Sequence, residues 1–144
     1  YLTPKGNKLN QKKIKKFIKK DNLILVCGKY EGIDQRVIDA WKMEEISTGD
    51  YISSGGEIPA MILIDSCVRL LPNVLGSKNS LKSETFENNL LEYPQYTKPR
   101  HWLGRKVPEV LLSGDHKKIE EWKKKESIRI TKIKRPDLFK KVIK

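Results

Sequence analysis

The sequence predicts an α/β domain built on a parallel sheet, followed by a connecting segment and a basic, mostly helical region. Apolar runs typical of buried strands alternate with segments of helical periodicity as far as Pro72, as in a parallel sheet flanked by helices. A stretch of about thirty residues without periodicity then separates this part from a lysine-rich helical pattern that begins near Asp115.

The first strands and helices follow one another closely. Residues 1–3 have the pattern of the end of a strand, and residues 10–20 predict an amphipathic helix after a turn at residues 3–9. A continuous apolar strand is expected at residues 22–28. A short helix at residues 31–41 then has its apolar residues at helical spacing: Val37, Ile38 and Trp41.

The clearest helix lies in the middle of the chain. We expect a strand at residues 46–53, interrupted by Gly49, and then a helix that begins at Pro59 and ends at Pro72. One face of this helix is apolar and consists of Ala60, Leu63, Ile64, Cys67, Val68 and Leu71.

The second half of the chain divides into a loop and a helical part. Residues 76–107 are rich in Ser, Lys, Asn and Pro, which indicates a linker or a functional lid. Asp115 suits the N-cap of a long helix, and a short helix is expected after Pro136. We therefore expect a domain at residues 1–76, an interdomain linker at 77–106 and the start of a helical basic domain at 107–144.

The charge of the chain favours a polyanionic partner. Thirty basic residues against 18 acidic ones give a formal net charge of +12, and RNA is the first candidate. The alternative is that the lysines, which make up most of the basic residues, only form solvated helix faces.

The cysteines and apolar runs exclude several classes of protein. Cys27 and Cys67 lack the spacing of a disulfide framework or a zinc site and are expected to be buried, as in a protein of the reducing cytoplasm. The longest apolar runs are too short to cross a bilayer. Since the chain does not begin with methionine and opens within a strand pattern, we expect a fragment that lacks an N-terminal part of the sheet.

Two glycine-bearing segments, VCGKYEGID at residues 26–34 and ISTGDYISSGGEIPA at residues 46–60, follow or interrupt the predicted strands. Glycines at strand ends are typical of a pocket built from loops, although simple turns are an equal alternative. The nucleotide-binding patterns GxxxxGK[ST] and GxGxxG are absent. A ligand of this pocket is therefore expected to be held by its nucleoside and polar tail rather than by a pyrophosphate.

Four segments, YLTPKG, LVCGKYEGIDQRVI, EEISTGDYISSGGEIPAMILIDSCVR and VPEVLLSGDHKKIEEWKKKES, resemble in order and interval the bacterial tRNA (guanine-N1)-methyltransferase family TrmD, of the SPOUT class. The resemblance implies a deep trefoil knot in the sheet, an exception to the rule that chains do not thread their own loops. It also implies methyl transfer from S-adenosylmethionine to N1 of guanine 37 of tRNA. A homodimer with the active site at the subunit interface is implied as well.

The resemblance assigns the cofactor site to three loops. Residues 1–76 would then be the knotted S-adenosylmethionine-binding domain, and 107–144 the start of the tRNA-binding domain. Lys29 departs from the family, where arginine is common, and loses a forked donor. The implied cofactor-binding residues are Leu2, Thr3, Pro4 and Gly6, then Gly28, Tyr30, Glu31 and Gly32, and finally Thr48, Gly49, Asp50, Tyr51, Ile52, Ser53, Gly55 and Gly56.

The implied catalytic residues are Arg69 and Glu84. Arg69 corresponds to the cation that stabilises charge at guanine O6, and Glu84 stands where the family usually has the aspartate that acts as the base. Glu87 is a rival for the base. Without the resemblance, an i,i+4 ion pair with Asp65 would explain Arg69. A divalent ion cannot be assigned to any residues.

Several aromatic residues and a histidine are weaker candidates. Trp102 is the preferred RNA contact, and Trp122 is expected in the core. His116 is expected to support a helix cap rather than to contact RNA. Tyr93 and Tyr96 are expected to order the loop. The alternatives to the implied activity are another SPOUT-class RNA methyltransferase and a non-catalytic RNA-binding module.

Overall fold

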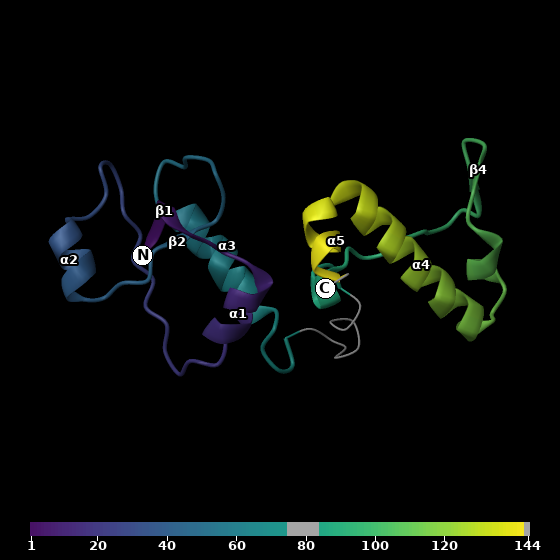
Figure 1. Cartoon of the computed structure of the whole chain (residues 1–144), viewed down its shortest axis with the longest axis horizontal. Helices are drawn as coiled ribbons and strands as arrows, with labels where there is room; N and C mark the ends of the chain where they lie inside the picture. The colour runs from purple at the N-terminus through teal and green to yellow at the C-terminus, as the bar shows by residue number, and fades with distance from the viewer. Residues whose placement is uncertain (75–83, 143–144) are drawn as a thin grey trace. The chain divides into compact units, whose positions relative to one another are not determined.

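The structure, a computed structural model, describes residues 1–74 and 84–142. The chain divides into two compact units, Tyr1–Gly76 and Ser77–Lys144, each of which is considered by itself (Figure 1).

The sheet of the first unit is small and parallel. Strands β1 (Leu2–Lys8) and β2 (Ile46–Ser47) pair in parallel, and an isolated parallel bridge joins Leu2 to Cys27. The Leu2 N–H donates to the Val26 carbonyl at 3.1 Å, and the Ile46 N–H donates to the Tyr1 carbonyl at 2.8 Å. The first strand of the chain therefore lies between two segments that follow it in sequence.

Strand β1 contains an irregularity that shapes the unit. Leu2 and Asn7 both align with Ile46, so the four residues between them leave the regular ladder. Gly6 lies in this interval, and a Cβ there would overlap the backbone of Glu45 and Ile46. Only glycine permits this close approach. The predicted turn at residues 3–9 is therefore wrong as a boundary, because the strand continues to Lys8 with a bulge inside it.

Two of the predicted helices are present in this unit and contact each other. Helix α1 (Gln11–Phe17) begins at Asn10, whose side chain accepts a hydrogen bond from the Lys13 N–H at 3.0 Å. Helix α3 (Glu57–Val68) begins slightly before the predicted Pro59 and ends before the predicted Pro72. Of its expected apolar face, Ala60 and Leu63 are buried, whereas Ile64, Val68 and Leu71 are exposed. The core of the unit consists of Leu2, Ile14, Ile46, Ala60 and Leu63.

Three predictions for the first unit are wrong in extent or burial. Residues 22–28 contribute only the bridge at Cys27, which is exposed, and Ile24 is 86% exposed. The strand expected at 46–53 ends at Ser47. A parallel strand is buried only where neighbours cover it, and within residues 1–74 the sheet gives these apolar residues too few neighbours.

Helix α2 (Gln35–Ala40) is shorter and more exposed than predicted. It begins at Asp34, whose side chain accepts a hydrogen bond from the Arg36 N–H at 2.8 Å. Ile38 is buried, whereas Val37 and Trp41 are exposed. The helical spacing was correct, but only one residue of the expected apolar face is covered.

The second unit is built around helix α4 (His116–Lys134) and helix α5 (Pro136–Val142). The predicted cap of α4 is confirmed, since the Asp115 side chain accepts from the Lys118 N–H at 3.1 Å. Trp122 is partly buried against Tyr93 and Tyr96, with ring centroids 6.3 and 6.2 Å away. Trp122 therefore packs inside this unit, and the two tyrosines order the chain around it.

The segment before α4 contains short elements that the sequence pattern did not predict. They are the 3₁₀ turns η2 (Glu87–Asn89) and η3 (Glu109–Leu112) and an antiparallel hairpin of β3 (His101–Trp102) and β4 (Arg105–Lys106). Strands of two residues are too short to produce a periodic pattern.

Candidate functional site

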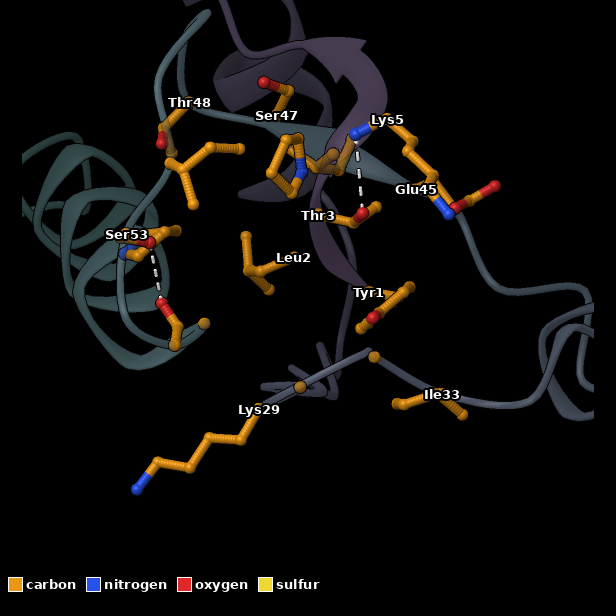
Figure 2. Close-up of a pocket in the computed structure, with 18 of the residues that line it drawn as sticks. Tyr1, Leu2, Thr3, Lys5, Lys29, Ile33, Glu45, Ser47, Thr48 and Ser53 are labelled. Atoms are coloured by element: carbon orange, nitrogen blue, oxygen red, sulfur yellow. Dashed lines mark hydrogen bonds between the residues drawn. The ribbon is translucent and has the colours of Figure 1, made fainter.

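A cavity of about 230 Å³ lies in the first unit, where three segments far apart in the sequence meet (Figure 2). The segments are residues 1–5, the loop from Gly28 to Ile33 and the loop from Glu45 to Gly56. Strand β1 supplies the first segment and β2 opens the third, so the parallel pairing brings them to one edge. The cavity is therefore built mainly from backbone turns at the ends of strands.

Most residues of the expected cofactor set line this cavity. They are Leu2, Thr3, Pro4, Gly28, Tyr30, Glu31, Gly32, Thr48, Gly49, Tyr51, Ile52, Ser53, Gly55 and Gly56. Two expected residues lie outside it. Gly6 packs against the backbone of Glu45 and Ile46, and the Asp50 carboxylate pairs with Lys8 at 2.5 Å.

The second and third loops touch each other through glycine backbone. The Gly56 N–H donates to the Gly28 carbonyl at 3.0 Å. A Cβ at Gly56 would lie 2.8 Å from the Cα of Cys27 and 3.1 Å from the Gly28 nitrogen, both of them backbone atoms. Any larger residue at position 56 must therefore push the two loops apart.

The second loop turns back toward the start of the chain. The Gly32 N–H donates to the Lys29 carbonyl at 3.0 Å, and both Tyr30 (φ 54°) and Gly32 (φ 99°) have left-handed backbone. The Tyr1 hydroxyl lies where a Cβ at Gly28 or Gly32 would approach it, at 2.8 and 2.9 Å. The two glycines thus leave room for an aromatic ring on the first segment.

Serine hydroxyls fix the third loop. The Ser47 hydroxyl donates to the Gly49 carbonyl at 3.0 Å and accepts from the Gly49 N–H at 3.2 Å. The Ser53 hydroxyl donates to the Gly55 carbonyl at 2.8 Å, a bond drawn in Figure 2. Each serine therefore holds the backbone two residues further along in a tight turn.

Lys29 lies at the rim of the cavity. Its side chain is 61% exposed, and its Nζ atom is 3.8 Å from Oε1 of Glu57. Figure 2 shows this side chain extending away from the other labelled residues. The departure from the arginine common in the family therefore falls on a side chain directed out of the cavity.

Several lining residues were missed from the sequence, and their signal was indirect. Tyr1 is one of the missed residues. Its only signal was the pair Gly28 and Gly32, which lack the side chains that would collide with its ring. The remaining missed residues are Lys5, Lys29, Ile33, Gln35, Ile38, Glu45, Ile46, Ser47, Ser54 and Pro59. Ile38 and Ile46 are buried residues that also line the cavity.

Comparison with known proteins assigns the chain to a family. The family model described as tRNA (Guanine-1)-methyltransferase TrmD matches residues 1–141. The chain belongs to this family. The match extends from the first segment of the cavity into α5 and so includes residues of both units.

Individual TrmD relatives are similar over nearly the whole chain. A tRNA (guanine-N(1)-)-methyltransferase of Clostridioides difficile is 59% identical over 141 residues, which cover 98% of this chain and 61% of that protein. The protein of the same name from Pelagibacter ubique is 52% identical over 141 residues, 98% of this chain and 62% of that protein. One from Alkaliphilus oremlandii is 54% identical over 143 residues. The chain thus spans about three fifths of the length of these relatives.

The two candidate catalytic residues of the TrmD resemblance lie in different units. Arg69 caps the C-terminal end of α3, where its N–H donates to the Asp65 carbonyl at 3.1 Å and its side chain is partly buried. Glu84 is partly buried next to Thr85, whose Oγ1 accepts a hydrogen bond from the Glu92 N–H at 3.1 Å. Glu87 begins η2.

Nearby donors lower the pKa values of two carboxylates in the second unit, Asp115 and Asp137. The N–H and side chain of Lys118 hold the pKa of Asp115 below its ordinary value. The Arg135 guanidinium lowers the pKa of Asp137 to about 2. His116, the first residue of α4, is exposed. The hydrogen bond that caps the helix is accepted by the Asp115 side chain from the Lys118 N–H.

Residues 1–74 and 84–142 contain neither a cluster of metal ligands nor a membrane-spanning helix. In these residues no three His, Cys, Asp or Glu side chains gather closely enough to hold a metal ion. Within the same described residues, no helix is long and apolar enough to span a membrane.

Proposed function

We propose that the protein transfers a methyl group from S-adenosylmethionine to N1 of guanine 37 of tRNA, next to the anticodon. The observation that carries the proposal is the cavity where three segments of a TrmD family member meet, two of which contain glycines. The formal net charge of +12 supports a tRNA substrate, because neutralising phosphates releases counterions. We place the reaction in the cytoplasm, where tRNA is modified.

The lining of the cavity suits a nucleoside, although the cavity itself is small. Its volume of about 230 Å³ is slightly below the lower bound of roughly 300 Å³ for small-molecule sites. Backbone N–H and carbonyl groups of the glycine loops would hold an adenine edge, and Leu2, Ile38 and Ile46 supply apolar contact. S-adenosylmethionine, when bound, supplies a methyl group on a positively charged sulfur.

Two side chains of this chain would manage the proton and the charge. Guanine N1 carries a proton that must leave before the nitrogen can be methylated, and Glu84 accepts it. Negative charge then develops toward guanine O6, where the Arg69 guanidinium stabilises it. Glu84 extends one methylene further than the aspartate usual in the family, so the segment that carries it must sit correspondingly further from guanine.

The assignment of the base is tested by two matched substitutions. In the full-length protein, Glu84→Gln is expected to lower methylation by about a hundredfold or more, the low end for general base catalysis, and to leave S-adenosylmethionine affinity unchanged. Glu87→Gln is the matched control, expected to retain activity. Loss of methylation in Glu87→Gln with activity kept in Glu84→Gln would reverse the assignment.

The fold and assembly belong to the same proposal. We infer a trefoil knot in the domain of residues 1–76, a linker at 77–106 that carries the base, and the start of a tRNA-binding domain at 107–144. The position of β1 between two later segments and the bulge at residues 3–6 support the knot. The boundary between the two compact units, after Gly76, supports the first domain limit.

We also infer a homodimer whose active site combines the cavity of one subunit with Glu84 of the other. Mixing a Glu84→Gln subunit with a Gly56→Val subunit tests this arrangement, because one mixed site then keeps both a cavity and a base. Recovery of about a quarter of wild-type activity, as random pairing predicts, supports the shared site. A mixture as inactive as its components contradicts it.

Two alternatives rest on the departures at Lys29 and Glu84. One is a SPOUT-class RNA methyltransferase with another target, such as a ribose hydroxyl, and the other is an RNA-binding module that has lost catalysis. Nucleoside analysis of tRNA treated with the full-length protein separates them. 1-Methylguanosine supports the proposal, another methyl nucleoside supports the first alternative, and no product supports the second.

A further inference from the structure

The β3–β4 hairpin presents an exposed tryptophan at a tight turn. Strands His101–Trp102 and Arg105–Lys106 are joined by Leu103 and Gly104, whose φ angles of 46° and 74° are both left-handed. This is the two-residue connection that matches the twist of a hairpin. Figure 1 shows the hairpin projecting from the body of its unit.

Apolar side chains on this hairpin are directed to solvent. Trp102 is 59% exposed and Leu103 is 76% exposed. The Arg105 guanidinium lies 6.0 Å from the centroid of the Trp102 ring, a cation–π distance. Trp122, by contrast, is packed between Tyr93 and Tyr96, so the unit covers one tryptophan and displays the other.

The charges around Trp102 are of one sign. The run from Lys98 to Lys106, KPRHWLGRK, contains Lys98, Arg100, Arg105 and Lys106 and no acidic residue. A flat aromatic ring among cations matches an unpaired base together with its phosphates. A second copy of this chain is a poor partner for this surface, because the chain itself carries a net charge of +12.

We propose that the hairpin His101–Lys106 is an RNA-contacting element in which Trp102 stacks on an unpaired base and the flanking basic side chains contact phosphates. The proposal rests on the proposed function for the identity of the RNA, a tRNA. It assigns the hairpin a role in substrate affinity that is separate from the cavity in the first unit. Arg105 would then make two interactions: a cation–π contact with the Trp102 ring and an ion pair with an RNA phosphate.

The test is equilibrium binding of an unmodified tRNA transcript to the full-length protein, measured without methyl donor. Trp102→Ala is expected to weaken binding roughly 5- to 150-fold, the range for the loss of one base–aromatic stack. Trp102→Phe keeps a stacking face and is expected to recover most of this loss. Because the Trp102 side chain is exposed, the thermal unfolding midpoints of all variants should match wild type.

Trp41 provides a matched control. It is 78% exposed, more than Trp102, and lies in the first unit at the end of α2, so Trp41→Ala removes an accessible indole elsewhere. Trp41→Ala is expected to leave tRNA affinity within twofold. Equal weakening by both alanine variants would overturn the proposal, as would a Trp102→Ala protein that binds tRNA like wild type.

The salt dependence separates stacking from phosphate contact. Lys106→Gln is expected to reduce the slope of log affinity against log salt by about 0.7 to 0.9, whereas Trp102→Ala leaves the slope unchanged. Anionic phosphatidylglycerol vesicles test the competing membrane role of an exposed tryptophan. If Trp102→Ala lowers vesicle binding but not tRNA binding, the hairpin is a membrane contact and the proposal is wrong.

The hairpin and the proposed function fail in different ways. If the full-length protein forms no 1-methylguanosine but Trp102→Ala still weakens tRNA binding, the hairpin proposal stands and the catalytic one falls. If methylation depends on Glu84 but tRNA binding is insensitive to Trp102, the hairpin proposal alone is wrong.

Discussion

Single glycines decide whether the candidate cavity exists. The space beside each glycine differs: a Cβ at Gly56 meets the backbone of Cys27 and Gly28, whereas a Cβ at Gly55 meets the carboxylate end of Glu57. Backbone cannot move away without opening the loops, but the end of an exposed glutamate can rotate. The two adjacent glycines are therefore unequal in what they tolerate.

Gly56→Ala and Gly55→Ala form a matched pair at this site. Overpacking costs typically 1 to 3 kcal/mol, so Gly56→Ala is expected to lower S-adenosylmethionine affinity by roughly tenfold or more. Gly55→Ala is expected to cost at most about threefold, because only the Glu57 side chain must turn. Isothermal titration of both variants checks the order, and equal affinities would contradict the close approach of the two loops.

The N-terminus of α4 is a local element whose stability depends on pH. The pKa of Asp115 is lowered by hydrogen bonds from the Lys118 N–H and side chain, so the ionised form stabilises the fold. This contribution is fully present above the ordinary pKa of 3.8 and is lost as pH falls through the lower folded-state value. Asp137, with a pKa of about 2, adds a similar dependence near the start of α5.

Substitutions at Asp115 separate the cap from the charge. Asp115→Ala is expected to lower the urea midpoint at neutral pH, because the Lys118 N–H loses its acceptor. Asp115→Asn keeps a cap oxygen, so it should hold the midpoint near wild type and show a weaker fall in stability below about pH 4. Urea unfolding followed by circular dichroism checks this, and an unchanged acid limb in Asp115→Asn would rule out Asp115 as a source of the pH dependence.

Thr131 joins α4 to the segment that carries Glu84. It is fully buried, its hydroxyl donates to the Ser127 carbonyl at 2.6 Å, and it accepts from the Leu91 N–H at 2.8 Å. The same segment is closed by the Phe86 N–H, which donates to the Leu90 carbonyl at 2.8 Å. The chain near Leu91, a few residues after Glu84, is therefore attached to α4 by this hydrogen bond.

Thr131→Val removes this hydroxyl with little change in shape. The Leu91 N–H, which is partly buried, then loses its acceptor, which is expected to cost about 1 kcal/mol of unfolding free energy. Thr131→Ser keeps the hydroxyl and should therefore lose less unfolding free energy than Thr131→Val. Chemical denaturation measures both, and a Thr131→Val protein as stable as wild type would show that the Leu91 bond contributes nothing.

Sequence patterns predicted the starts of helices well but predicted poorly which strands are covered by neighbouring segments. The caps at Asn10 and Asp115 and the helices they begin follow from residues close in sequence, so they were predictable. The strand expected at residues 22–28 depended on neighbours that the sequence pattern cannot supply, and Ile24 is exposed. The hairpin around Trp102 was missed because its strands are two residues each.

At the scale of the whole molecule, the chain combines a cavity in one unit with a basic helical unit that carries the candidate base. Most of the expected cofactor residues meet at one cavity, but that expectation came from the family resemblance, since the glycines alone were equally compatible with turns. Asp50 and Gly6 belong to the same segments but lie outside the cavity: the Asp50 carboxylate pairs with Lys8, and Gly6 packs against the backbone of Glu45 and Ile46. Which residue of a loop faces the cavity is decided by contacts distant in sequence.

The proposed function is tested most directly by the position of any methyl group that appears on tRNA treated with the full-length protein. Two transcripts that differ only in guanine or adenine at position 37 are incubated with S-adenosylmethionine, and their nucleosides are analysed by mass spectrometry. The proposed function predicts 1-methylguanosine in the first transcript and no methylation in the second. A methyl group on a ribose or another base, or equal methylation of the two transcripts, would contradict it.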